Sequence, residues 1–238
     1  MFRILCLSLL VLFTSVSTPT ASESHLNQVN IKVYASEFAW KAEQLYQDFG
    51  LEMLLPIKAF EQALEGYYSI DHPKTNILSI VDFSKPSTEK RMFILDMDNM
   101  QVLYHTYVAH GRGSGGNIAT SFSNIHGSFQ SSLGFFRTAQ TYHGGNGYSL
   151  IIDGLEKGIN DQARARAVVI HGADYSSEGF VARHGRLGRS HGCPALPREL
   201  NQEIIDTIKG GSLLYIFADN ADYELSSTLL NDSNSWAE

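Results

Sequence analysis

Glycine is distributed unevenly along this chain of 238 residues, and its distribution limits the folds open to the second half. Eighteen of the 20 glycines lie at or beyond Gly111, between short segments rich in β-branched and aromatic residues. Glycine destabilises helix interiors and favours turns, which argues against long helices in this part. Many short strands joined by Gly-rich loops predict one mainly β (α+β) domain with helices on its outside.

The expected elements follow from the spacing of apolar residues. We expect strands over Asn76–Phe83, Arg91–Asp96, Gln101–Ala109, Tyr148–Ile152, Ala167–His171 and Ser212–Ala218, with a hairpin at Asp98-Asn99. Residues 24–68 show helical spacing interrupted at Gly50 and Pro56, and residues 199–208 predict one more helix. Residues 111–147 show little periodicity. Residues 220–238 are polar and are expected to be frayed.

The first residues have the layout of a secretory signal peptide. Arg3 precedes an apolar run from Ile4 to Phe13, and small residues follow, with cleavage expected near residues 17–22. An apolar run of about ten residues is too short for a spanning helix, which needs roughly 20. We therefore expect an exported protein of the periplasm or cell envelope, with no membrane span after cleavage. The predicted divisions are 1–22 signal peptide, 23–54 N-terminal helical segment, 55–218 catalytic domain and 219–238 polar C-terminal tail.

Charge and cysteine content exclude several classes of protein. The chain has 18 Lys and Arg against 25 Asp and Glu, a formal net charge of −7, which disfavours binding to nucleic acid. Its two cysteines are too few for a disulfide scaffold. Removal of the signal peptide would remove Cys6 and leave Cys193 as a single thiol. In an oxidising compartment such a thiol forms an intermolecular link or is reactive.

The surroundings of Cys193 favour a catalytic thiol over a structural one. It lies in the run Ser190-His191-Gly192-Cys193-Pro194. An imidazole can take the thiol proton, a glycine lets a substrate carbonyl approach the backbone, and the Gly192 and Cys193 amides are candidate oxyanion donors. Pro194 stiffens the turn.

The order of residues along the chain identifies the candidate base. All nine histidines precede Cys193, so the nucleophile-before-histidine order of papain-like peptidases does not apply. His171 ends an apolar strand, where a rigid sheet can hold its ring toward a site, and we favour it as the base. His191 lies only two residues before the thiol and is expected to be a supporting group.

A dinucleotide-binding site and a zinc site are both disfavoured. Gly111, Gly113 and Gly116 match a dinucleotide-binding pattern, but no apolar helical period follows, so an active-site wall is preferred. His171, His184, His191 and Cys193 fit no standard zinc spacing. We expect no metal and no cofactor.

Together these motifs resemble the L,D-transpeptidase catalytic domain family (YkuD-type), and within it the murein L,D-transpeptidase branch. The family pattern is His-Gly, a loop, and Ser/Thr-x-Gly-Cys, represented here by His171-Gly172 and Ser190-His191-Gly192-Cys193. The stretches VAHGRGSG, SSLGFF, GYSL, DGLEKGIND, ARAVVIHGA and GRLGRSHGCPAL fit that branch. The resemblance covers Leu55–Ala218 and implies an L,D-transpeptidase-type β-sandwich with flanking helices.

The resemblance also implies a reaction in peptidoglycan. Cys193 would attack a donor stem peptide to form a thioester, and an amine of an acceptor stem would resolve it as a crosslink. His171 would be the base, oriented through the Gly172 carbonyl, while Ser190, His191 and Gly192 would shape the oxyanion site. Water as acceptor would give an L,D-carboxypeptidase or amidase, and the same site could attach or release a wall-bound protein. A catalytically silent wall-binding protein is a third hypothesis, against which the intact His171 and Cys193 pair argues.

One departure concerns recognition of the donor's terminal carboxylate. Many family members carry Arg or Asn just after the cysteine, where this chain has Pro194-Ala195-Leu196-Pro197. Arginine forks suit carboxylates, so the upstream arginines are candidate replacements: Arg183, Arg186 and Arg189. By family position alone, the further candidate pocket residues are Tyr148, Ser131, Ser132 and Phe135.

Overall fold

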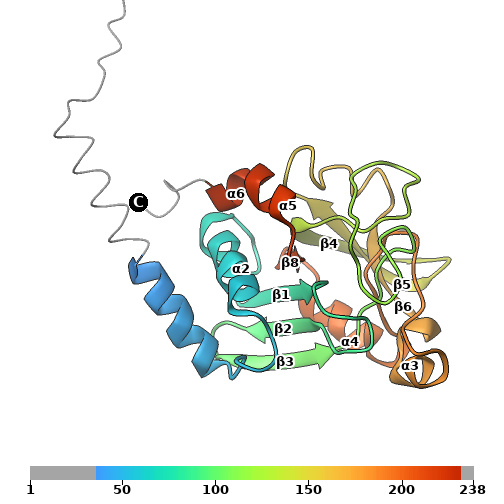
Figure 1. The fold of residues 1–238 in the computed structure, drawn as a ribbon, viewed down its shortest axis with the longest axis horizontal. Coiled ribbons are helices and arrows are strands. Elements are labelled where there is room, and N and C mark those ends of the chain that lie inside the picture. The colour runs from blue at the N-terminus through green and yellow to red at the C-terminus, as the bar shows by residue number, and fades with distance from the viewer. Residues whose placement is uncertain (1–35, 232–238) are drawn as a thin grey trace, which may run out of the picture.

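The computed structural model describes residues 36–231. Residues 36–48 are helical, and the remaining elements follow in the order α2 (Ile57–Ser69), β1 (Ile77–Asp82), β2 (Met92–Asp96), β3 (Gln101–Thr106), β4 (Gly134–Gly144), β5 (Gly147–Gly154), β6 (Val169–Ala173), a 3-10 turn (Asp174–Ser176), α3 (Glu178–His184), β7 (Ala195–Pro197), α4 (Arg198–Ile208), β8 (Leu213–Phe217), α5 (Ala221–Ser226) and α6 (Thr228–Asn231) (Figure 1). The mainly β prediction with flanking helices is confirmed.

The strands form one curled sheet in the order β3-β2-β1-β8-β4-β5-β6-β7. β1 pairs with β8, and β6 with β7, in parallel, whereas the other neighbours are antiparallel. Beyond the end of β3, Ala109 exchanges hydrogen bonds of 2.8 and 3.2 Å with Ala195 of β7. This bridge brings the two edges of the sheet together, so the sheet approaches a closed barrel.

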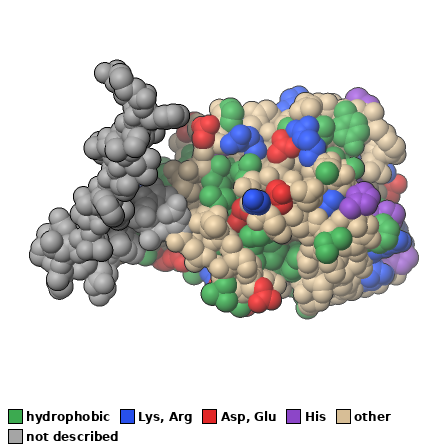
Figure 2. All heavy atoms as spheres, turned by 90° about the horizontal axis from the view of Figure 1, so that it is seen from above, with side chains coloured by type: hydrophobic (Ala, Val, Ile, Leu, Met, Phe, Trp, Pro, Cys, Tyr) green, Lys and Arg blue, Asp and Glu red, His purple; other side chains and the backbone are tan. Residues whose placement is uncertain are grey.

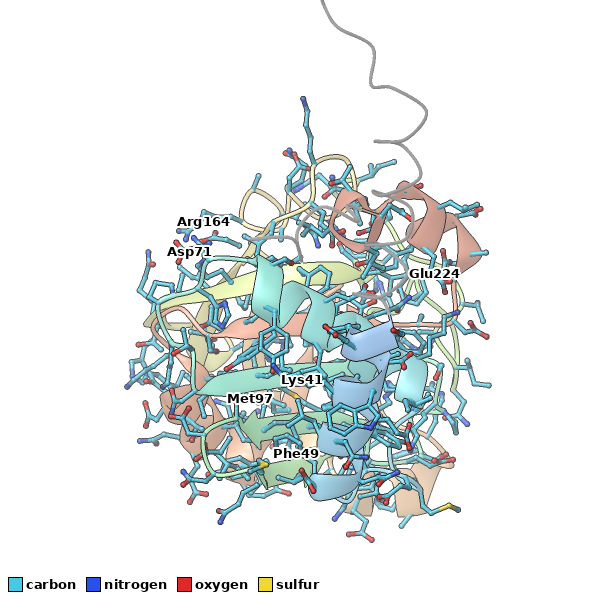
Figure 3. All side chains as sticks on the ribbon, turned by 90° about the vertical axis from the view of Figure 1, so that its left-hand side faces the viewer. Lys41, Phe49, Asp71, Met97, Arg164 and Glu224 are labelled. Atoms are coloured by element: carbon cyan, nitrogen blue, oxygen red, sulfur yellow. The ribbon has the colours of Figure 1, made fainter. Side chains whose placement is uncertain are left out.

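The central strands β1 and β8 are buried along their whole length, as their apolar sequences predict for parallel strands covered on both faces. α2 packs on both of them, and α4 packs on β5, β6 and β7. Figure 3 shows the N-terminal helix, which contains Lys41 and ends just before Phe49, lying in front of the strands. Phe49, directly after this helix, is buried in the main core cluster and contacts Phe60 of α2, so the segment packs against the core.

Several elements were not predicted from the sequence, among them β4 and α3. β4 is the longest strand, but its outer half is an exposed hairpin arm that lacks an apolar alternation. α3 buries no residue and therefore has no apolar stripe. Its ends did carry a local signal: the Ser177 side chain accepts from the Phe180 amide, and Gly185 ends the helix at φ 69°.

The expectation that residues 220–238 are frayed is wrong for 221–231, which form α5 and α6. The physical reason is a buried carboxylate. Glu156 Oε2 accepts from the Phe135 amide at 2.7 Å, and Oε1 accepts from the Ser227 hydroxyl at 2.5 Å. The Tyr223 hydroxyl donates to the same carboxylate, which thereby fixes the C-terminal helices to the sheet.

Replacing Glu156 by alanine is expected to lower the free energy of unfolding by about 3 kcal/mol, because three buried donors lose their acceptor. Urea unfolding with an unchanged m-value measures this effect. Glu156→Gln, which keeps one acceptor oxygen, should cost less. Equal stability of the alanine variant and the wild type would show that Glu156 does not fix α5 and α6.

The predicted signal peptide, residues 1–22, lies outside the described residues. Within residues 36–231, no helix combines the length and the apolar character needed to cross a bilayer.

Candidate active site

The Cys193 thiol lies in a turn that runs directly into β7, against the start of β6. Its Sγ accepts from the Val169 amide at 3.5 Å and donates to the Ala167 carbonyl at 3.7 Å. Cys193 is half-buried. Burial raises the pKa of the thiol, an effect partly offset by the Val169 amide and by the charge of Arg166.

His171 lies on β6, two residues beyond Val169, and its side chain is buried. Its Nδ1 donates to the Gly172 carbonyl at 3.1 Å. A carbonyl oxygen only accepts, so Nδ1 carries the proton and Nε2 keeps a free lone pair. The ring therefore has the tautomer that a general base requires.

The pKa shifts of His171 and Cys193 both favour their uncharged forms. Burial lowers the pKa of His171, with the Gly172 carbonyl acting in the opposite direction and Arg198 in the same direction. Burial also raises the pKa of Cys193. Both shifts favour a neutral thiol beside a neutral imidazole, and the thiol hydrogen bonds observed go to the β6 backbone. Proton transfer to His171 would then accompany attack on the substrate.

The Cys193 turn is held by serine side chains and by close glycine contacts. Ser190 Oγ donates to the Cys193 carbonyl at 2.6 Å, and Ser131 Oγ donates to the Gly192 carbonyl at 3.1 Å. A Cβ at Gly111 would lie 2.8 Å from Gly192 Cα. Gly111 is thus required where the wall of the site meets the turn, and no helix follows it before residue 134.

Only one of the two expected oxyanion donors is free. The Gly192 amide donates to Ser190 Oγ at 3.1 Å, so the expectation that it binds an oxyanion is corrected. Gly192 instead has φ 125°, a conformation that glycine tolerates and that completes the tight turn. Among residues 36–231, the Cys193 amide donates to no other residue, and Pro194 has no amide hydrogen.

An open cleft of about 490 Å³ lies on the His171 side of the site. The lining residues come from the β4–β5 turn, β6, the 3-10 turn, α3 and α4: Gly145, Asn146, Gly147, His171, Gly172, Ala173, Asp174, Tyr175, Phe180, Arg183 and Arg198. Arg198 pairs with Asp174 at 2.5 Å. Arg183 makes no ion pair within the described part of the chain, so its charge faces the cleft unpaired.

Several predicted substrate-binding residues do not line this cleft. Arg186 donates to the Leu187 carbonyl at 2.7 Å, and Arg189 donates to the Gly115 carbonyl at 2.9 Å. The Tyr148 hydroxyl donates to Asp206 of α4 at 2.7 Å. Ser149 pairs with His171 in the sheet, and adjacent residues of a strand point to opposite faces, so Tyr148 points away from the face that carries His171. These side chains support the local structure.

Two further candidates by family position are internal. Phe135 is fully buried and stacks on Tyr215. Ser132 is buried, donates to the Ser123 carbonyl at 2.8 Å and accepts from Arg166 at 2.6 Å. Ser132 therefore contacts Arg166, the arginine beside the Cys193 turn.

His191 is exposed and packs on Phe129, with ring centroids 4.8 Å apart. The Arg112 guanidinium covers the same Phe129 ring at 4.0 Å. Its exposure and its packing on Phe129 place His191 at the rim of the site.

Arg166 is the neighbour of the thiol that the sequence analysis did not identify. It lies in the stretch ARAVVIHGA but resembles the exposed Arg164 two residues earlier. Arg164 pairs with Asp153 at 2.5 Å, whereas the charge of Arg166 acts on Cys193. Sequence spacing does not distinguish the two.

The segment that carries the candidate catalytic residues is rich in arginine, although the whole chain is acidic. Six arginines and only two acidic residues lie between residues 164 and 198. Figure 2 shows Lys, Arg and His side chains gathered at its right-hand end, where Figure 1 places α3.

Comparison with known proteins gives one family. A model of the family described as the L,D-transpeptidase catalytic domain matches residues 52–217. No curated protein matches the chain.

Several solved structures are similar. An L,D-transpeptidase from Mycobacterium smegmatis is 15% identical, with a TM-score of 0.38 and coverage of 60% of this chain and 59% of that one. The helical cell shape determining protein Pgp2 from Campylobacter jejuni is 13% identical, with a TM-score of 0.41 and coverage of 68% and 55%. The chain thus spans less than two thirds of either protein.

Proposed function

Because the chain belongs to the L,D-transpeptidase catalytic domain family, we propose that it is an exported cysteine acyltransferase that crosslinks peptidoglycan in the periplasm or cell envelope. The observation that carries the proposal is the tautomer of His171, whose Nε2 is free on the strand against which the Cys193 thiol lies. The N-terminal sequence supports export.

The proposed reaction has two halves. Cys193 Sγ attacks the carbonyl of a donor stem peptide while His171 Nε2 accepts the thiol proton. A C–S bond forms, the Cys193 amide binds the oxyanion, and the terminal D-residue leaves as its amine takes the proton from His171. An acceptor amine then attacks the thioester, His171 accepts its proton, and the thiol is released with a new amide crosslink.

Incubation of the mature protein with a purified disaccharide-tetrapeptide tests this proposal. We expect a covalent adduct on Cys193 in the intact-protein mass spectrum, free D-amino acid and a dimeric muropeptide. Release of the D-amino acid without dimer would identify a carboxypeptidase. An alkylatable thiol with no adduct and no product would contradict acyl transfer from stem peptides and favour a silent wall-binding protein or a different donor.

The unpaired Arg183 suggests where the leaving residue binds. The leaving amine must lie beside His171, which protonates it, and the acceptor amine later takes the same place. The cleft that contains His171 also contains Arg183. We therefore assign the carboxylate of the terminal D-residue to Arg183, in place of the residue that many relatives carry after the cysteine.

Arg183→Gln is expected to raise KM about ten-fold for a tetrapeptide donor with a free terminal carboxylate, because a partly solvated charge-assisted pair is lost. A donor with an amidated terminus should be processed equally by both proteins. Arg186→Gln removes the same charge three residues further along the chain, outside the cleft, and should leave KM near the wild-type value. An equal loss with both donors would contradict carboxylate recognition.

A further inference from the structure

The guanidinium of Arg166 is locked in place by four hydrogen bonds. Nη1 donates to the Ser123 carbonyl at 2.5 Å and to Ser132 Oγ at 2.6 Å. Nη2 donates to the Gln130 carbonyl at 2.6 Å and to Ser128 Oγ at 3.3 Å. Both terminal nitrogens are thus fully engaged, so the group is a fixed charge that cannot swing toward a ligand.

The backbone brings this fixed charge to the Cys193 turn. Ala167 has φ 55°, a left-handed conformation unusual for a residue other than glycine, and its carbonyl accepts from the Cys193 thiol. A Cβ at Gly192 would lie 3.5 Å from Arg166 Nη2. The guanidinium therefore borders the same turn that presents the thiol.

Arg166 has no carboxylate partner among residues 36–231, although it is half-buried. Its four hydrogen-bond acceptors are neutral. The ionisable groups whose charge interacts with that of the thiol are Arg166 and Tyr175. Burial and Cys193 raise the pKa of Tyr175 to about 12, so its hydroxyl stays neutral. Within residues 36–231, the thiolate of Cys193 is the anion whose charge acts on Arg166.

We propose that Arg166 is a positioning residue whose fixed positive charge favours the Cys193 thiolate and the negative charge that passes to the substrate carbonyl. The serine and carbonyl partners of Arg166 fix its guanidinium beside the turn. Burial disfavours the charged thiolate, and the positive charge of Arg166 offsets this effect. The role at the substrate oxygen rests on the proposed function. The role at the thiolate is independent of any substrate.

Alkylation by iodoacetamide isolates the second role, since the Cys193 sulfur forms a bond to carbon and iodide leaves without a cell-wall substrate. For Arg166→Gln we expect alkylation at pH 7 to slow about ten-fold, with the midpoint of its pH profile displaced to higher pH. Arg166→Lys keeps the charge and should stay within about three-fold of wild type. Lys157→Gln removes an exposed charge from the preceding loop and should match the wild type.

An unchanged pH profile in Arg166→Gln would overturn the inference, even if crosslinking were lost. Slower alkylation with an unchanged midpoint would also overturn it, because it would indicate altered access to the thiol. If Arg166→Gln does not fold, Arg166→Lys provides the test. A displaced midpoint of the alkylation pH profile in Arg166→Lys, which keeps the positive charge, would contradict an electrostatic role. The two proposals can also fail separately. If the wild type makes no dimeric muropeptide but the alkylation midpoint is displaced in Arg166→Gln, the proposed function is refuted and the inference about Arg166 stands.

Discussion

Replacing Cys193 by alanine is expected to lower the rate of crosslinking by about 10⁴-fold or more, to the background rate, because no other side chain can form the thioester. The measurement is dimeric muropeptide formed from a tetrapeptide donor, together with the mass of the protein. Neither a covalent adduct nor labelling by a thiol reagent should remain, since the mature protein is expected to contain no other cysteine.

The fold should survive this substitution. The thiol makes only two long hydrogen bonds, of 3.5 and 3.7 Å, and the turn is held instead by the Ser190 and Ser131 side chains. Its free energy of unfolding should stay within about 1 kcal/mol of the wild-type value. A folded alanine variant that still makes crosslinks would refute the covalent mechanism.

The parts of the fold that were predictable are those in which one physical signal dominates. β1, β2 and β8 are short apolar runs buried on both faces, and each was predicted within two residues of its observed ends. β4 was missed because half of it is a polar hairpin arm. α5 and α6 were missed because they are fixed by the buried Glu156, which lies 65 residues before the start of α5 and leaves no local pattern.

The same distinction applies to the site. Cys193 and His171 were identifiable because their neighbours and their order along the chain are chemically unusual. The role of Arg166 depends on Ser123, Ser128 and Ser132, which are brought to it by long-range packing. The Gly192 amide was misjudged because the hydroxyl of Ser190 folds back onto it, a contact that the sequence order does not predict.

Replacing His171 by alanine is expected to slow formation of the thioester by about 10² to 10⁴-fold, the usual contribution of a general base. His191→Ala should cost less than about ten-fold, because its exposed ring contacts Phe129 at the rim and not the thiol. Single-turnover mass spectrometry of the thioester measures both variants. A larger loss in His191→Ala would assign the base to His191.

The pH dependence gives an independent check of His171. A base must be neutral to accept a proton, and burial lowers the pKa of this imidazole below its ordinary value. The wild-type enzyme should therefore keep its rate of thioester formation as the pH falls through the range in which an exposed histidine becomes protonated, and lose it only at more acidic pH. Arg198 acts on His171 in the same direction as burial, so Arg198→Gln should move this acidic limb to higher pH. An acidic limb that is absent in His171→Ala but unchanged in His191→Ala would identify the titrating group as His171.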